Sequence, residues 1–312
     1  MAFVLRIILV MLALMLTGEA IAGRVIINRP LSDNDVRYQY PELLLQMVLD
    51  ATESEYGADR VVQADQVMPR DTAFLELVKG EVIQVMAEAP KPDWEEHLIP
   101  IRIPIRKGVQ GFRVFLIMKE NQHLLRQIGT LQEFIQLPTG SGAQWSTARV
   151  MRDAGFDVIS SDNYEELFEM LANGRFHTFG RGVNEVYSEF YRNVTKFPEL
   201  RVDDALMLYI PLPTYFFVTP KRPDLAKRIE AGLMAMIADG RFDDFFCRYH
   251  SQDIEAANIG KRKVFCIPNA NLSSQTPFER REFWTSERCG LNISPIDYSR
   301  AGAPKIGQCT FQ

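Results

Sequence analysis

The feature that most constrains the fold is an alternation of short apolar strands and amphipathic helices that occurs twice along the chain. The first copy has predicted strands at Val25–Asn28, Val61–Met68 and Val82–Met86. The second copy has predicted strands at Phe134–Leu137, Asp157–Ser160 and Arg175–Phe179. Strands that alternate with helices indicate mostly parallel sheets covered by helices on both faces. The sequence therefore predicts two similar α/β lobes.

The helices between these strands support the repeat. In the first copy they are expected around Leu44–Ala51 and at Asp71–Lys79, and in the second at Ala143–Ala154 and Tyr164–Asn173. The ends of the second helices correspond, because Phe74, Leu77 and Gly80 align with Phe168, Leu171 and Gly174. In each copy a glycine closes the helix before the chain enters a strand.

Two further segments are expected to connect the lobes. The apolar run Gly111–Lys119 is suited to cross from the first lobe to the second, and Ala205–Pro220 is suited to return. A long helix at Asp224–Asp239, ended by Gly240, follows the return. Parallel sheets bind ligands at the carboxyl ends of their strands, so a ligand cleft is expected between the lobes.

The first 22 residues have the pattern of a secretory signal peptide. Arg6 supplies the positive charge, Ile7–Leu16 form the apolar core, and Ala20–Ala22 place small residues before a cleavage site at Gly23. We expect export to the periplasm. An uncleaved membrane anchor is the alternative, but a spanning helix needs roughly 20 apolar residues.

Composition narrows the possible partners. With 46% apolar residues the chain is expected to fold into globular units, and its net charge of -5 lacks the basic character of a nucleic-acid binder. The four histidines are scattered along the chain, so no metal and no cofactor is expected.

The four cysteines lie close to the C-terminus. Cys247, Cys266, Cys289 and Cys309 contain no Cys-x-x-Cys pair, which argues against zinc and thioredoxin-like sites. In an oxidising compartment they predict two disulfides that staple the tail, with three possible connectivities, of which sequential pairing is favoured. A buried free thiol at Cys247 is the alternative. The tail is expected either to wrap the first lobe or to dock a membrane partner.

Two segments carry a resemblance to a known family. Leu171–Arg175 (Leu-Ala-Asn-Gly-Arg) is similar to a helix end before a central strand, and Asp224–Phe242 resembles a C-terminal helix and its turn. From Val25 to His250 the chain resembles type II periplasmic binding proteins of the family 3 solute-binding group. Ile101–Pro104 and Arg181–Glu185 look like a less-studied branch. The resemblance implies a monomeric, two-lobed protein that closes by hinge motion on a solute and delivers it to an ABC-type transporter or a sensor.

The expected organisation follows from this resemblance. It consists of a signal peptide at 1–22, the first part of lobe 1 at 23–112, lobe 2 at 113–205, a return to lobe 1 at 206–253 and a Cys-containing C-terminal extension at 254–312.

One departure from the amino-acid binders concerns the ligand. Those proteins hold the ligand carboxylate with an arginine after the third strand, and the nearest alignment puts Trp94 there. An indole cannot form the bidentate pair that a guanidinium makes with a carboxylate. Arg102 or Arg106 is placed to compensate from the next turn. We therefore expect a small anionic or zwitterionic solute.

Three features are candidates for ligand binding. The first is the glycine-rich turn Thr139, Gly140, Ser141 and Gly142, whose N–H groups are suited to an anion, or which is an ordinary turn. The second is a set of aromatic and basic residues near strand ends, each of which alternatively packs or faces solvent: Tyr38, Tyr40, Trp94, Trp145, Arg29, Arg102 and Arg181. The third is Asn184 with Glu185, for which a helix cap is the alternative.

Enzymatic signatures are absent from the sequence. It contains no Gly-x-Ser-x-Gly, Ser-x-x-Lys or His-Glu-x-x-His pattern. A dehydratase on this fold needs one ionisable group in the cleft, and His177 or Glu185 is placed to serve. A second alternative is a degenerate domain that has lost ligand binding and acts as an adaptor. Binding without turnover is the expected function.

Overall fold

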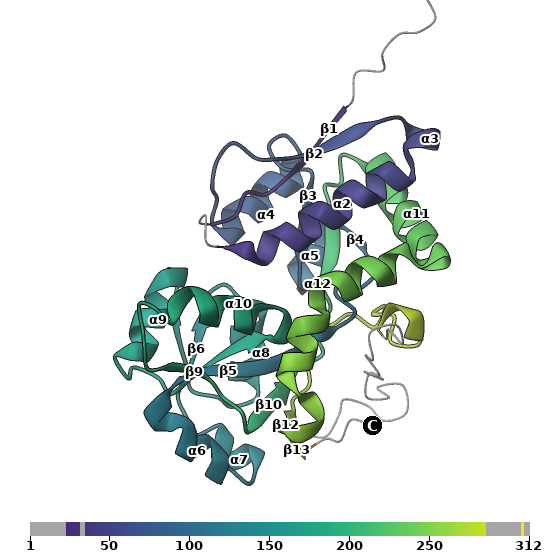
Figure 1. The fold of residues 1–312 in the computed structure, drawn as a ribbon. Helices are drawn as coiled ribbons and strands as arrows, with labels where there is room; N and C mark the ends of the chain where they lie inside the picture. Colours follow the sequence, from purple (N-terminus) through teal and green to yellow (C-terminus); the bar gives the residue numbers. More distant parts are fainter. Residues whose placement is uncertain (1–22, 32–34, 285–306, 309–312) are drawn as a thin grey trace, which may run out of the picture.

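The computed structural model describes residues 23–31, 35–284 and 307–308, so the signal peptide, Cys289 and Cys309 lie outside the described residues. Two lobes are stacked along the long axis of the molecule (Figure 1). Segments from both halves of the sequence contribute to each lobe. No helix of the described ranges has the length and apolar character needed to cross a bilayer.

Lobe 1 is built around a five-stranded sheet of order β2-β1-β3-β11-β4. Its strands are β1 (Gly23–Ile27), β2 (Asp59–Gln63), β3 (Val85–Glu88), β4 (Ile99–Ile101) and β11 (Tyr215–Val218). Its helices are α2 (Gln39–Ala51), α3 (Glu53–Tyr56), α4 (Arg70–Lys79), α5 (Pro92–His97) and α11 (Pro223–Asp239). β1 pairs in parallel with β2 and β3, whereas β11 is antiparallel to both of its neighbours.

Lobe 2 contains an eight-stranded sheet of order β13-β12-β10-β5-β8-β6-β7, and β9 also pairs with β5. Its strands are β5 (Phe112–Met118), β6 (Thr139–Gly142), β7 (Val158–Ser161), β8 (Thr178–Gly182), β9 (Leu200–Val202), β10 (Leu206–Tyr209), β12 (Lys263–Cys266) and β13 (Gly307–Gln308). Its helices are α6 (Gln122–Gln127), α7 (Leu131–Phe134), α8 (Ser146–Asp153), α9 (Tyr164–Ala172) and α10 (Val183–Asn193). Short 3-10 helices are η1 (Val36–Tyr38), η2 (Val109–Gly111), η3 (Lys119–Asn121), η4 (Ile259–Lys261) and η5 (Arg281–Phe283).

The two sheets share one plan, in agreement with the predicted pair of similar lobes. The chain crosses to lobe 2 between β4 and β5, so that the predicted crossing at Gly111–Lys119 is mostly the lobe 2 strand β5, and it returns between β10 and β11, within the predicted Ala205–Pro220. The order β2-β1-β3-β11-β4 corresponds to β7-β6-β8-β5-β10, and in each sheet the fourth strand is the one that the chain forms directly after it arrives from the other lobe. These inserted strands are buried on both faces. In β5, Val114 contacts one core cluster and Phe115 another, and in β11 Phe216 and Phe217 alternate in the same way. Strands that are buried on both faces have continuous apolar sequences, so both of these strands could be predicted from the sequence.

The predicted strand at Phe134–Leu137 is wrong. Phe134 ends α7, whose first turn is fixed by a capping box between Thr130 and Glu133. The strand is instead β6, made of Thr139–Gly142. Its glycines are required by packing, because the ring of Phe176 occupies the place of a Cβ on Gly140. The predicted helix ends are confirmed, since Gly80 and Gly174 have φ of 75° and 67°.

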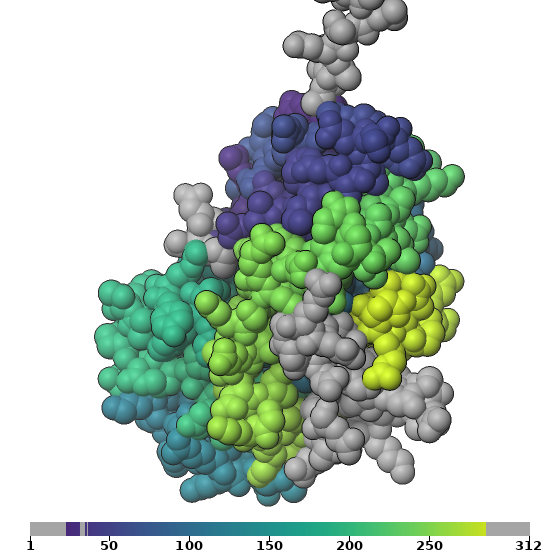
Figure 2. Space-filling view, turned by 45° about the vertical axis from the view of Figure 1, so that its right-hand side comes forward, coloured from purple at the N-terminus to yellow at the C-terminus, as the bar shows by residue number. Residues whose placement is uncertain are grey.

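Helix α12 (Arg241–Ala257) passes from lobe 1 to lobe 2 along the surface (Figures 1 and 2). Near lobe 1 the ring of Phe245 stacks on Tyr40, with 5.0 Å between the ring centroids. Further along, α12 packs against α10 of lobe 2. The helix is thus a third connection between the lobes, beside the two crossing strands.

The described part of the tail does not simply wrap lobe 1. β12 first joins the lobe 2 sheet, in parallel with β10, and Cys247 and Cys266 are both disulfide-bonded. The chain then returns to the crossing segment, where Trp284 packs against Gly108 and the Lys107 ammonium donates to the Glu282 carbonyl at 2.7 Å. The tail therefore extends one lobe and covers the hinge.

Candidate functional site

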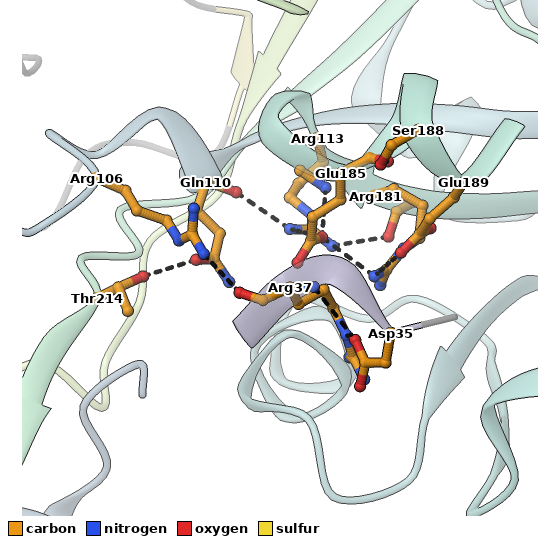
Figure 3. A network of polar contacts seen from close by, with 12 residues as sticks. Asp35, Arg37, Arg106, Gln110, Arg113, Arg181, Glu185, Ser188, Glu189 and Thr214 are labelled. Atoms are coloured by element: carbon orange, nitrogen blue, oxygen red, sulfur yellow. Dashed lines mark hydrogen bonds and ion pairs between the residues drawn. The ribbon is translucent and has the colours of Figure 1, made fainter. Parts of the chain in front are cut away.

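A cavity of about 60 Å³ lies between the lobes. Lobe 1 contributes side chains from η1, from the start of α4 and from the end of β3, and lobe 2 contributes side chains from α8, β8 and α10. The crossing segments supply its remaining wall. Its main polar lining consists of Arg37, Arg70, Glu88, Arg106, Gln110, Arg113, Ser146, Thr147, Arg181, Glu185 and Thr214. Figure 3 shows how most of the charged members point toward one another.

The lobe 2 wall is a buried ionic network. The Arg181 guanidinium on β8 donates to both carboxylate oxygens of Glu189, at 2.5 and 2.6 Å. Glu185 lies 3.2 Å from Arg181 and 3.7 Å from Arg113, and it accepts the Gly182 N–H at 3.0 Å. Burial by itself raises the pKa of Glu185, but Arg181, Arg113 and Arg37 outweigh it and lower this pKa to about 2. Glu185 is therefore ionised at neutral pH.

A lobe 1 arginine reaches across to aromatic rings of lobe 2. The Arg37 guanidinium donates to both oxygens of Asp35, at 2.6 and 2.7 Å. It also lies 5.3 Å from the ring centroid of Trp145 and 5.0 Å from that of Tyr164. Arg181 lies over the same indole at 4.3 Å. Such cation–π contacts tie η1 to lobe 2 and cover Trp145 with the protein's own cations.

Arg106 is the buried cation with the least compensation. It is 4% exposed, and no carboxylate of the described residues lies within ion-pair distance of it. Its guanidinium donates to the Arg37 carbonyl at 2.8 Å, contacts His250 Nε2 at 3.2 Å and lies 4.7 Å from the Tyr40 ring centroid. Burial lowers the pKa of Arg106, and burial together with Arg106 lowers the pKa of His250 well below its usual value, so His250 is neutral.

The neighbouring Arg113 is also buried, and Glu185 lies 3.7 Å from its guanidinium. Arg113 is 3% exposed and donates to the carbonyls of Gln110 and Gly180 at 3.1 and 2.8 Å. Burial lowers the pKa of Arg113 to about 10, with Glu185 acting in the opposite direction. Arg113 remains protonated at neutral pH, so two buried guanidiniums flank η2 where the chain crosses between the lobes.

Five of the residues singled out from the sequence line this cavity: Tyr38, Arg106, Trp145, Arg181 and Glu185. Tyr40 lines a neighbouring cavity of about 210 Å³, and its hydroxyl donates to the Ile105 carbonyl at 2.8 Å.

The other singled-out side chains are engaged elsewhere. Trp94 is a core residue of lobe 1 that packs on Phe74 and Phe217. Arg102 pairs with Glu95 at 2.6 Å. Arg29 donates to the Asp65 carbonyl at 2.8 Å on the surface. None of these three is among the residues that line the interlobe cavity.

The prediction of a glycine-rich turn at residues 139–142 is wrong, because these residues form the strand β6. Thr139, Gly140 and Ser141 are buried in β6, between β7 and β8, rather than in a loop before a helix. The Thr139 hydroxyl donates to the Thr178 carbonyl at 3.1 Å. Because these backbone groups belong to the sheet, the three residues do not line the interlobe cavity.

Sequence reasoning missed Arg37, Arg70, Glu88 and Arg113. Glu88 is the last residue of β3 and pairs with Arg70 at 2.5 Å, so the rule that sites lie at the carboxyl ends of strands pointed to it. Arg113 is the second residue of β5, directly after the chain has crossed between the lobes. No local pattern marked Arg37. Among residues 23–31, 35–284 and 307–308 no group of three potential metal ligands is present.

No family model and no curated protein matches the chain. Solved structures do match its fold. An ancestral arginine-binding protein bound to arginine is 16% identical, with a TM-score of 0.54 over 73% of this chain and 98% of the other. An arginine 3rd transport system periplasmic binding protein from Legionella pneumophila is 13% identical, with a TM-score of 0.55 over 73% of this chain and 100% of the other.

A third match is an ancestral amino acid-binding protein described as a precursor of cyclohexadienyl dehydratase. It is 13% identical, with a TM-score of 0.52 over 73% of this chain and 96% of the other. At these identities the likeness concerns the fold. The chain thus has the two-lobed type II fold of the periplasmic amino-acid-binding proteins, as expected from the sequence.

Proposed function

We propose that this protein binds a small organic anion in the cleft between its lobes, in the periplasm, and presents it to a transporter or a sensor by hinge closure. The observation that carries this proposal is the buried guanidinium of Arg106, which faces the cavity without a carboxylate partner among the described residues. A buried charge is costly unless it is paired, and a ligand carboxylate supplies the missing partner.

The balance of charges around the cavity supports an anion. Four of the five lining arginines have a carboxylate nearby: Arg37 with Asp35, Arg70 with Glu88, Arg113 with Glu185 and Arg181 with Glu189. Arg106 is left over. A cationic ligand such as arginine would add to this excess, and Trp145 is already covered by Arg37 and Arg181. The arginine binders of similar structure therefore support the fold rather than the ligand.

Closure follows from the origin of the lining residues. Arg37 and Arg70 belong to lobe 1 and Arg181 to lobe 2, so an anion between them is held fully only when the lobes are together. A ligand shifts such an equilibrium by the difference in its affinity for the two states. The closed surface is then the signal that a permease or a sensor recognises.

Binding rather than catalysis is proposed because Glu185, one of the two candidate catalytic groups, is held ionised by arginines. The other candidate, His177, does not line the cavity. An adaptor without a ligand is the second candidate function. It is favoured by Arg37, whose contacts with Trp145 and Tyr164 already join the two lobes.

The test is isothermal titration of residues 23–312 with butyrate, succinate and phosphate, against arginine and lysine. We expect at least one anion to bind and the cations not to bind. Arg106→Gln should weaken anion binding by roughly tenfold to a hundredfold, since a hydrogen bond to a charged group contributes about 1.5–3 kcal/mol. Arg102→Gln, whose partner Glu95 lies outside the cavity, is the matched control.

Binding of arginine with no anion binding contradicts the proposal, and so does anion binding that Arg106→Gln leaves unchanged. If no compound binds and native mass spectrometry finds no retained ligand, the adaptor becomes the better assignment.

A further inference from the structure

A second, larger cavity adjoins the arginine-lined cavity at the mouth of the cleft. Its volume is about 620 Å³, and it shares Arg70 and Trp145 with the inner cavity. Lobe 1 contributes Pro69 and Arg70, whereas lobe 2 contributes the segment Gly142–Trp145 and residues around the start of α9. A volume in this range is typical of small-molecule sites. The two spaces together form one site with an inner and an outer part.

The inner part is too small for a whole metabolite. At about 60 Å³ it lies well below the roughly 300 Å³ at which small-molecule sites begin, and it has room for a few waters or a carboxylate group. A solute whose carboxylate is bound there must continue outward. The shared residues Arg70 and Trp145 place the outer cavity next on that path.

The residues that line the outer cavity indicate which chemical groups the rest of the solute carries. Pro69, Trp145 and Tyr164 offer apolar and aromatic surface on opposite sides. The charged residues on the lobe 2 side are Asp162 and Glu165, both exposed, and the one lining cation, Arg70, is already paired with Glu88. This environment favours an apolar group and disfavours a second anionic group.

A third cavity of about 440 Å³ also adjoins Trp145, but its character differs. Its charged lining consists of Asp71, Lys91, Asp93 and Arg149, two of each sign. It shares Trp145 and Ser146 with the inner cavity, but it shares no arginine with it. It therefore suits water or a polar group better than an apolar one.

We propose that the solute is an organic monocarboxylate with an apolar body, either an aliphatic chain or an aromatic ring, which lies in the cavity between Pro69 and Tyr164. This inference rests on the proposed function, because it assumes that the arginine-lined cavity binds the carboxylate. It adds the chemical class of the remainder of the ligand and the cavity that recognises it.

The first experiment is a chain-length series measured by isothermal titration with the mature chain. The probes are acetate, butyrate, hexanoate, octanoate and 3-phenylpropionate, with 3-phenylpropanol as the uncharged counterpart. We expect each added methylene to tighten binding roughly fourfold until the cavity is filled. We expect 3-phenylpropanol to bind at least about tenfold more weakly than 3-phenylpropionate, because it lacks the carboxylate that the arginines hold.

A matched pair of variants then locates the apolar group. Asp162→Trp places an indole in the outer apolar cavity, and Asp93→Trp makes the same change, with the same loss of charge, in the polar cavity. Both positions are exposed, so both variants are expected to fold. Asp162→Trp should weaken octanoate binding about tenfold and leave acetate binding unchanged, whereas Asp93→Trp should alter neither.

The outcomes separate this inference from the proposed function. If anions bind with an affinity that does not depend on chain length, or if Asp93→Trp is the variant that weakens octanoate, the inference is overturned while the proposed function stands. If no carboxylate binds at all, both fail. If 3-phenylpropanol binds as well as 3-phenylpropionate, the outer cavity is a separate site and the inference is again overturned.

Discussion

The two lobes share one strand order but present different surfaces to the cleft. Lobe 2 offers Arg181, Glu185 and Glu189 as a closed network on β8 and α10, with each side chain almost fully buried. Lobe 1 offers Arg37 and Arg70, each with a single carboxylate partner and each partly exposed. A repeated topology thus fixes where the site lies without fixing the chemistry of its two faces.

The connections explain this difference. In lobe 2, α10 begins at Val183, directly after β8 ends at Gly182, and the Glu185 carboxylate caps the helix by accepting the Gly182 N–H. In lobe 1, Arg37 lies on the short η1, within the long connection between β1 and α2. The lobe 2 face is therefore preorganised, whereas the lobe 1 face depends on contacts across the cleft.

The largest expected effect tests the lobe 2 network. Arg181→Met leaves Glu185 and Glu189 buried without their main partner, which should cost about 3–5 kcal/mol in the free energy of unfolding. Arg37→Met leaves one buried carboxylate, Asp35, without its partner, and should cost about 1–3 kcal/mol. Urea unfolding of both variants measures the difference. Equal losses would show that the two faces are equally preorganised.

A second test concerns the tail, which contacts the hinge between the lobes. Trp284 is 1% exposed, stacks on Phe278 and covers Gly108, so Trp284→Ala should cost about 3 kcal/mol. Glu279→Ala, at an exposed position of the same segment, is the control and should have little effect. If calorimetry shows no change for Trp284→Ala, the tail does not stabilise the hinge.

The third test uses pH at the helix that joins the lobes. Because burial and Arg106 lower the pKa of His250, the unfolded state takes up a proton below about pH 6.5 that the folded state does not. Stability should fall by about 1.4 kcal/mol per pH unit as the pH decreases from 6.5. Burial raises the pKa of Asp253 to about 6, which opposes this trend, so the comparison is with His250→Gln.

His250→Gln keeps an acceptor for the Arg106 guanidinium and removes the titration. The difference in stability between the two proteins should therefore shrink as the pH falls from 6.5 to 5. A difference that does not depend on pH would mean that His250 is protonated in the folded state.

The smallest expected effects lie outside the cleft. Lys196 pairs with Glu169 in lobe 2, and Arg222 pairs with Asp224 in lobe 1, and all four side chains are largely exposed. Lys196→Ala and Arg222→Ala should each change stability by about 0.5 kcal/mol or less, and less still in high salt. A larger loss in one lobe, seen in thermal melting, would mean that the lobes differ beyond their cleft faces.

The fold was largely predictable because apolar residues recur with a clear helix or strand period in most of its elements. Strands such as β5 and β11 are apolar on both faces and stand out in the sequence. β6 was misplaced because its residues are small and have a low strand propensity. It forms a strand because Phe176 packs on Gly140 and Trp145 packs on Gly142. These contacts depend on the tertiary fold, so the local sequence does not show them.

The site was less predictable, for a different physical reason. Trp145, Arg181 and Glu185 lie close to strand ends, so the general rule located them. Arg29 and Arg102 lie in similar places along the chain but bond to Asp65 and Glu95 instead. Which arginine faces the cleft is decided by the meeting of the two lobes, and the local sequence does not contain that information.

The inserted strands determine when each lobe can finish folding during synthesis. β11 fills the place between β3 and β4, and β12 joins lobe 2 only at residues 263–266. A chain that has been synthesised as far as β4 has a gap in the first sheet, with the facing edges of two strands unpaired. Neither lobe is then a finished folding unit. Both must be completed late in synthesis, from segments that are far apart in the sequence.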